Sequence, residues 1–373
     1  MADPVRIREI AVTRQPVNHR GDWVFLTLTD ADGRVGFGEA SHSGDDDAVA
    51  RLLTGSVGEQ LRDTAWDEPS AAWQALDVAT PPGTARRVSA TAASAAEQAL
   101  WDLAAQQAGV GLASLLGAPT DARSIPLYAN INRATVDRSP AGFAASATAA
   151  ARDGFRTIKL APFDEVVYDT AVGDHRRLAQ PGIDRVAAVS EAVGPDVRVL
   201  VDCHWRFDVA SALDVARELA ALDVGWFEDP VPYEEGPADV AAVRSAAPLP
   251  IATGERLIGA TAFEPFLAAE AADYYLPDIK HIGGIGELLA LARASEGSGA
   301  QITPHNPSGP VSTLASAQAL AGVPHAGPLE FAWGEVPWRP ALLAPPERIE
   351  DGALVLPLDQ PGLGARLVEG PGR

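Results

Sequence analysis

Three carboxylates recur at a regular interval in the middle of the chain. Asp202, Glu228 and Glu255 lie 26 and 27 residues apart, and each ends a short apolar run (VLVD, GWFE and IATGE). Like charges that are held close together repel one another and resist burial, unless a cation lies between them. Carboxylate oxygens, completed by water and substrate, suit Mg²⁺. The pattern therefore predicts a magnesium site with these three ligands.

A lysine and a glutamate end apolar runs of the same kind. Lys159 lies in FRTIKLAP, and alternation along a strand places it on the side opposite to its apolar neighbours, where it can pair with a substrate carboxylate. Glu330, in PLEFAWGE, is placed to hydrogen-bond a developing enolate oxygen, which requires that it be protonated or share a proton. Glu335 follows it as a weaker candidate.

An aspartate and a histidine end the sixth and seventh runs. Asp278 lies in LPDIKHIGG and His305 in ITPHNPSGP. Neighbouring strands lie about 4.7–4.9 Å apart, so these two side chains can hydrogen-bond. An aspartate partner fixes the imidazole tautomer, which suits a general base. We interpret His281, beside Gly283-Gly284, as a loop residue without an assigned role.

The elements that must position these side chains are short strands alternating with amphipathic helices. Such alternation predicts a parallel sheet. Eight strands, with no GxGxxG after the first, favour a closed barrel, whose active site lies at the C-terminal ends of its strands. The eight apolar runs are IPLYANI, FRTIKLA, VRVLVDC, VGWFEDP, LPIATGE, DYYLPDI, AQITPHN and PLEFAWG.

The segments on either side of the barrel are predicted to form a smaller α+β unit. Residues 5–14 and 22–30 are strand-like, Asp32-Gly33 is a hairpin turn, and residues 46–117 are mostly helical. We predict a capping domain of residues 1–123, a barrel of residues 124–340, and a Pro- and Gly-rich tail of residues 341–373 that packs back on the cap.

Composition narrows the classes of partner. The 373 residues carry a formal net charge of −21, which disfavours binding to nucleic acids or to anionic membranes. Cys203 is the one cysteine, so an intrachain disulfide is impossible. The N-terminal residues show no apolar signal region, and no apolar run is long enough to span a membrane. We expect a cytoplasmic protein with a small-molecule carboxylate substrate.

Taken together, these motifs resemble those of the enolase superfamily, in its mandelate racemase-like subgroup, over essentially the whole chain. The resemblance implies an α+β cap on a modified (β/α)₇β barrel, Mg²⁺ on the three carboxylates, and Asp278 with His305 as a base dyad. It also implies a homo-oligomer. The motifs that carry it are SAAEQALWDLAAQQAGVGLASLLGA, DCHWR, FEDP, TGER, PDIKHIGG and PHNPSGP.

One departure from the family pattern separates two reactions. Many members carry Lys-x-Lys at the second barrel strand, where the second lysine is a base opposite the histidine, but here the positions read Lys159-Leu160-Ala161. A racemase needs proton transfer on both faces of the α carbon, whereas a dehydratase needs one base and one acid. His204 follows Asp202 on the same side of its strand and is the acid candidate. With Arg206, these residues are similar to galactonate dehydratase-type members.

The resulting hypothesis is a Mg²⁺-dependent dehydratase of a sugar acid, either an aldonate or an aldarate, that forms a 2-keto-3-deoxy acid. A racemase or epimerase that uses His204, and a barrel that has lost its chemistry, are the alternatives. Arg206 either contacts substrate oxygens or is a surface arginine at a helix start. Asn132 and Trp333 at the rim, with the cap stretch 18–23, are expected to select the substrate.

Overall fold

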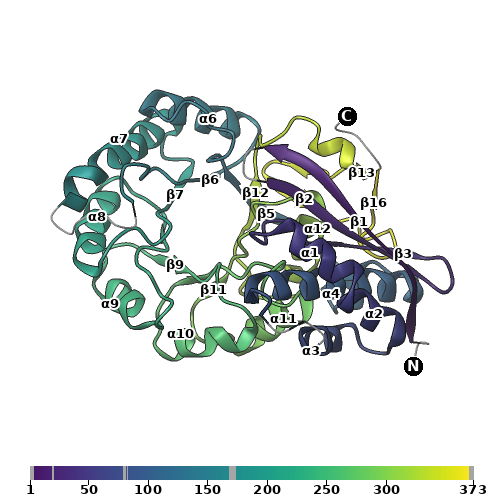
Figure 1. The fold of residues 1–373 in the computed structure, drawn as a ribbon. Helices are drawn as coiled ribbons and strands as arrows, with labels where there is room; N and C mark the ends of the chain where they lie inside the picture. Colours follow the sequence, from purple (N-terminus) through teal and green to yellow (C-terminus); the bar gives the residue numbers. More distant parts are fainter. Residues whose placement is uncertain (1–3, 19–20, 79–80, 82, 168–173, 369–373) are drawn as a thin grey trace.

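The computed structural model shows a ring of strands surrounded by helices, with a smaller α+β unit against one side (Figure 1). It describes residues 4–18, 21–78, 81, 83–167 and 174–368. Residues 19 and 20, inside the cap stretch expected to select the substrate, lie outside the described residues. Among the described residues, no helix is both long and apolar enough to cross a membrane.

The cap begins with an antiparallel sheet of order β3-β2-β1-β4. Its turn between β2 and β3 forms where Asp32-Gly33 predicted it, because Gly33 adopts the positive φ of 85° that the turn requires. The predicted strands are therefore confirmed. The four strands are β1 (Val5–Asn18), β2 (Gly21–Asp30), β3 (Val35–Glu39) and β4 (Ala65–Trp66).

The cap helices pack on this sheet around one buried helix. Most residues of α4 (Arg86–Ala108) are buried, and it ends at Gly109 in a left-handed conformation with φ 69°. Strand β3 lies so close to α4 that a Cβ atom on Gly38 would lie 1.9 Å from the carbonyl oxygen of Ala95. The other helices of the cap are α1 (Asp46–Thr54), α2 (Ser56–Asp63), η1 (Pro69–Ala71), α3 (Ala72–Val78) and α5 (Leu112–Leu115).

The predicted eight-stranded barrel is confirmed. The strands pair in parallel in chain order from β5 to β11, and the last strand, β12, pairs with the first. On its other side, Glu330 of β12 donates its N–H to Pro304, just after β11. The strands are β5 (Ser124–Asn130), β6 (Thr157–Leu160), β7 (Arg198–Asp202), β8 (Phe227–Glu228), β9 (Ile251–Thr253), β10 (Tyr274–Tyr275), β11 (Gln301–Ile302) and β12 (Leu329–Ala332).

Helical segments follow the first seven barrel strands, which gives the modified (β/α)₇β order. Asp208 caps α8 as its sequence suggests, by accepting a hydrogen bond from the N–H of Ser211. The face of α8 that meets the core carries four buried residues, Ala212, Val215, Ala216 and Leu219, while Val209 and Leu213 are partly buried against the same core. The segments are α6 (Pro140–Arg152), α7 (His175–Val193), α8 (Val209–Ala221), α9 (Ala238–Ala246), η3 (Ala260–Phe263), α10 (Glu264–Ala268), α11 (Ile285–Ala294) and α12 (Pro310–Leu320).

Large side chains fill the inside of the barrel below its mouth. This inner cluster lies on alternate positions of the strands, while their neighbours join the larger core between strands and outer helices. Ile158 and Leu160 belong to that outer core, so Lys159 points inward as predicted. The inner cluster comprises Tyr128, Leu200, Trp226, Ala252 and Leu276.

The tail contacts both the cap and the barrel. Leu363 donates its N–H to Asp102 of α4, whereas β15 pairs with the start of β5. We therefore propose that the described part of the tail, residues 341–368, joins the two units, beyond packing on the cap alone. It contains η4 (Arg339–Leu342), which begins just before it, β13 (Leu343–Ala344), β14 (Ile349–Glu350), β15 (Ala353–Val355) and β16 (Arg366–Leu367).

Candidate active site

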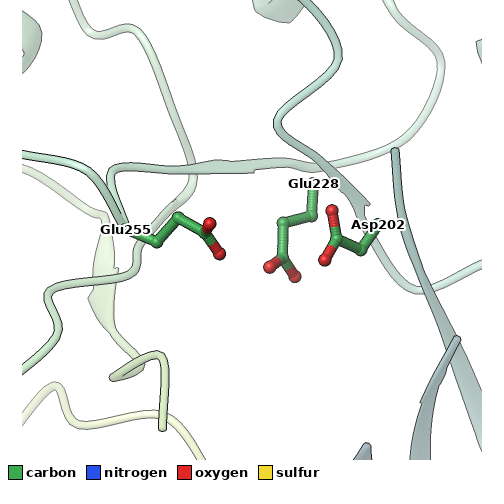
Figure 2. A group of neighbouring side chains, drawn as sticks. All are labelled: Asp202, Glu228 and Glu255. Atoms are coloured by element: carbon green, nitrogen blue, oxygen red, sulfur yellow. The ribbon is translucent and has the colours of Figure 1, made fainter. Parts of the chain in front are cut away.

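Three carboxylates meet at the mouth of the barrel (Figure 2). Asp202 is the last residue of β7, Glu228 is the last residue of β8, and Glu255 follows β9 by two residues. Each is buried and offers an oxygen that lies within 4.8 Å of the oxygens offered by the other two. The structure therefore brings together the three residues that the sequence predicts as metal ligands.

The donor set fits a hard divalent cation. All three side chains offer carboxylate oxygens, the ligand that Mg²⁺ prefers. Glu255 Oε2 is buried without a well-formed hydrogen bond, and three buried carboxylates in one place are unfavourable without added positive charge. These observations support a cation site at Asp202, Glu228 and Glu255.

Lys159 lies beside this carboxylate cluster. Its ammonium group is 2.7 Å from Glu228 Oε1, 3.2 Å from Glu330 Oε1 and 3.8 Å from Asp202 Oδ2. Burial alone would lower the pKa of Lys159, but Glu228 and Glu330 raise it well above its usual value. Lys159 is therefore a permanent positive charge at the mouth.

His204 lies next to Asp202 and owes its position to an unusual backbone conformation. Its φ is 51°, and its N–H donates to Asp202 Oδ1 over 3.0 Å. Its Nε2 lies 3.1 Å from Asp202 Oδ2. Burial would lower the pKa of His204, but Asp202 raises it above its usual value. A protonated imidazole that contacts the cluster can donate a proton there.

His305 forms the predicted contact with Asp278 on the neighbouring strand. Its Nδ1 is 2.8 Å from Asp278 Oδ2, and its Nε2 is 3.0 Å from Glu255 Oε2. An aspartate that accepts from Nδ1 leaves Nε2 as the nitrogen that faces the cluster. Strands β6 and β11 lie on either side of the strands β7, β8 and β9 that carry or precede the carboxylates, so Lys159 and His305 flank the carboxylates from two sides.

Lys280 is a member of the site that the sequence analysis missed. Its ammonium group contacts both oxygens of Asp278, at 2.7 and 2.8 Å, and its side chain is fully buried. Burial would raise the pKa of Asp278, but Lys280 and His305 hold it well below its usual value. Lys280 follows Asp278 by two residues, and its N–H also donates to Asp278 Oδ1 over 2.9 Å, so this short spacing was an available signal.

Glu330 is buried and accepts hydrogen bonds on both oxygens. Asn130 Nδ2 donates to Oε1 over 2.6 Å, and the N–H of Asn306 donates to Oε2 over 2.8 Å. Burial would raise the pKa of Glu330, but Lys159 lowers it below its usual value. A fully protonated Glu330 is therefore not favoured, and Lys159 beside it is the better donor to an enolate oxygen. That Glu330 shares a proton with such an oxygen remains a prediction.

The three side chains considered for substrate contacts, Arg206 and the rim residues Asn132 and Trp333, form hydrogen bonds within the protein. Arg206 donates to the carbonyl oxygen of Phe163. Asn132 Oδ1 accepts from Arg138, and Trp333 donates from Nε1 to Asp153 over 2.8 Å. Their part in substrate binding remains a prediction.

His281 connects the base dyad to the cap. Thr91 Oγ1 donates to the carbonyl oxygen of Arg87, so it accepts from His281 Nδ1 at 2.9 Å. Arg87 can only donate, so His281 Nε2 accepts its N–H at 2.9 Å. The imidazole is therefore neutral, in agreement with burial lowering the pKa of His281. It is a structural contact between α4 and the loop that carries Asp278.

Two buried glutamates of the cap hydrogen-bond to the loops that follow β10 and β11. Glu97 accepts from the N–H groups of Ile285 and Gly286 at the start of α11, each over 2.7 Å. Glu39 accepts from the N–H groups of Gly309 and Ser312 at the start of α12. The cap thus fixes the loops after β10 and β11, which present the base dyad.

Known proteins share this sequence and fold. The chain is 30% identical to a D-xylonate dehydratase of Haloferax volcanii, with 92% of this chain and 83% of the relative covered. It is 31% identical to a D-gluconate dehydratase of Thermoproteus tenax, covering 93% and 68%. A crystal structure from Labrenzia alexandrii, described as a mandelate racemase/muconate lactonizing enzyme, superposes with a TM-score of 0.85 at 27% identity, covering 98% and 95%.

Family models agree with these relatives. Residues 1–117 match the N-terminal domain of the mandelate racemase/muconate lactonizing enzymes, and residues 142–370 match the enolase C-terminal domain-like family. The predicted superfamily and fold are thereby confirmed: the chain belongs to the mandelate racemase/muconate lactonizing enzyme family of the enolase superfamily.

Proposed function

We propose that the chain is a hydro-lyase that dehydrates a sugar acid, with Mg²⁺ held by Asp202, Glu228 and Glu255. The observation that carries the proposal is the joint position of the three carboxylates, His305 and His204 at one barrel mouth. When bound, Mg²⁺ would supply positive charge for the substrate carboxylate and for the charge that develops on it during enolisation.

His305 is the proposed general base. Its Nδ1 is held by Asp278, so the lone pair of Nε2 is directed toward the carboxylate cluster, where the substrate carboxylate would bind. The α carbon is the atom next to that carboxylate, and because Nε2 lies 3.0 Å from Glu255 Oε2 of the cluster, we place the α carbon beside Nε2. His305 therefore takes the α proton, and Lys159 stabilises the enolate oxygens from the other side.

His204 is the proposed general acid. Its contact with Asp202 favours the protonated form, and it lies on the β7 side of the mouth, across from His305. His204 gives a proton to the β hydroxyl, which leaves as water while the Cα–Cβ double bond forms. The enol then tautomerises to a 2-keto-3-deoxy acid. One base and one acid suffice for this reaction.

The test is a library of aldonates and aldarates incubated with Mg²⁺, with keto-acid formation as the readout. We expect turnover of at least one acid, and its loss in His305→Asn with metal binding retained. Full activity in His305→Asn would contradict the assignment of the base.

A racemase or epimerase is the competing function, in which His204 replaces the missing second lysine as the base on the other face of the α carbon. It would be favoured by exchange of the α proton with D₂O in the wild-type enzyme without any keto acid. Position 161, where many family members carry a second lysine, is alanine in this chain, and this argues for the dehydratase.

A further inference from the structure

A second polar cluster lies at the barrel mouth, where the cap meets the loops after β5 and β12. Arg133, three residues after β5, donates to Glu335 Oε1 over 2.8 Å. Two cap residues reach this pair: Asn18 donates to Glu335 Oε1 over 2.9 Å, and His42 Nε2 lies 3.2 Å from Arg133. We call Asn18, His42, Arg133 and Glu335 the rim cluster.

The rim cluster adjoins the candidate active site. Strands β5 and β12 are paired, and Asn130 at the end of β5 donates to Glu330 of the site. Arg133 and Glu335 follow these two strand ends by three residues each. Lys159 contacts both Glu228 of the cation site and Glu330. A substrate whose carboxylate lies at the cation site would therefore extend its other end past Glu330 toward the rim cluster.

The rim cluster offers hydrogen-bonding groups without net positive charge. The charge of Arg133 is balanced by Glu335, whose side chain is only 1% exposed. Glu335 Oε2 is buried and has no hydrogen-bond partner among the described residues. A buried carboxylate oxygen without a partner is costly, and a hydroxyl group of a ligand would satisfy it. A second carboxylate would instead be repelled.

His42 adds a neutral donor. Arg133 can only donate hydrogen bonds, so His42 Nε2 accepts and Nδ1 carries the proton. His42 also has a φ of 63°, an uncommon backbone conformation for a residue other than glycine, of a kind that gathers at ligand sites. A neutral N–H donor beside a carboxylate acceptor suits hydroxyl groups.

The other described cations near the mouth already have hydrogen-bond partners. Arg87 donates to the carbonyl oxygen of His42 and to His281 Nε2. Lys159 contacts Glu228, and Lys280 contacts both oxygens of Asp278. Arg206 donates to the carbonyl oxygen of Phe163. A second carboxylate on the substrate would have to displace one of these partners, in a protein whose net charge is already −21.

We propose that the rim cluster binds the hydroxylated end of the substrate and makes the enzyme selective for acids with one carboxylate over acids with two. This inference rests on the proposed function, because it takes the first carboxylate to bind at the cation site. It narrows the substrate class from sugar acids to aldonates, and it assigns the selection to the Arg133–Glu335 pair.

The test compares acids of the same configuration that differ only at the terminal carbon: D-gluconate with D-glucarate, D-galactonate with galactarate, and D-xylonate with xylarate. We expect kcat/KM for the monoacid of the best pair to exceed that for the diacid by about 100-fold. Glu335→Gln releases Arg133 from its partner, so the ratio should fall at least 10-fold. Glu350→Gln is the matched control, since it breaks the exposed Arg348–Glu350 pair at the opposite end of the barrel and should leave the ratio unchanged.

His42→Asn provides a second variant, because asparagine tolerates the left-handed conformation. It should raise KM for the monoacid about 10-fold with little change in kcat. A wild-type enzyme that prefers the diacid, or a ratio unchanged in Glu335→Gln, would overturn the inference while the dehydratase function stands. Absence of keto acid from all six acids would overturn the proposed function, and the inference with it.

Discussion

Protonation of Glu97 should control how strongly the cap holds the barrel. Burial raises the pKa of Glu97 to about 8, against hydrogen bonds from Gly286, Ile285 and Trp101 that lower it. Its ordinary value is 4.5. The folded state therefore binds a proton more tightly than the unfolded state does. Stability is fully present below pH 4.5 and is lost as the pH rises through about 8.

The size of the effect follows from this shift. One pKa unit corresponds to about 1.4 kcal/mol, so the full loss amounts to about 5 kcal/mol. Between pH 6 and pH 8, the free energy of unfolding should fall by about 2 kcal/mol because of this group. Glu97→Gln cannot titrate and should lack this part of the pH dependence.

The assay is urea denaturation of the wild-type protein and Glu97→Gln at pH 6, 7 and 8. The difference between their free energies of unfolding should change by about 2 kcal/mol across this range, with the wild type losing stability relative to the variant. The absolute stability of the variant is not the readout, because glutamine cannot accept all three hydrogen bonds. A constant difference would refute the reasoning and would show that the three N–H donors keep Glu97 ionised.

Three further changes test other parts of the structure. Lys280→Met should lower kcat about 10- to 100-fold in steady-state assays, with little effect on KM, because Asp278 loses the cation that contacts both its oxygens. An unchanged kcat would show that Lys280 does not position Asp278. Glu255→Gln should weaken the binding of Mn²⁺ at least 10-fold, as measured by electron paramagnetic resonance. The same Mn²⁺ affinity in the variant and the wild type would show that Glu255 is not a metal ligand. Gly38→Ala should destabilise the protein by about 3 kcal/mol or more in thermal unfolding, because its Cβ would lie 1.9 Å from Ala95 O; wild-type stability would show that β3 can shift.

The sequence predicted the barrel and the residues at its strand ends because these depend on local patterns. Each short apolar run ends in a polar residue, and the C-terminal ends of parallel strands meet at one rim. Asp202, Glu228 and Glu255 are brought together for that reason, as are Asp278 and His305.

The contacts between the cap and the barrel could not be predicted in the same way. Glu97 and Ile285 are 188 residues apart in sequence, and Arg133 and Glu335 are 202 apart. No local period relates such positions, and their pairing depends on how two units dock. The partner of Trp333, Asp153, was missed for the same reason, because a rim position alone does not say which way a side chain turns.

The central claim is that His305 removes an α proton from a sugar acid bound at the carboxylate cluster. It is tested most directly by following the α proton of that acid by ¹H NMR in D₂O with Mg²⁺. In His204→Asn, which keeps the base and lacks the acid, we predict exchange of the α proton for deuterium with little keto acid. In His305→Asn we predict no exchange. Exchange at the same rate in both variants would contradict the account, because another group would then be the base.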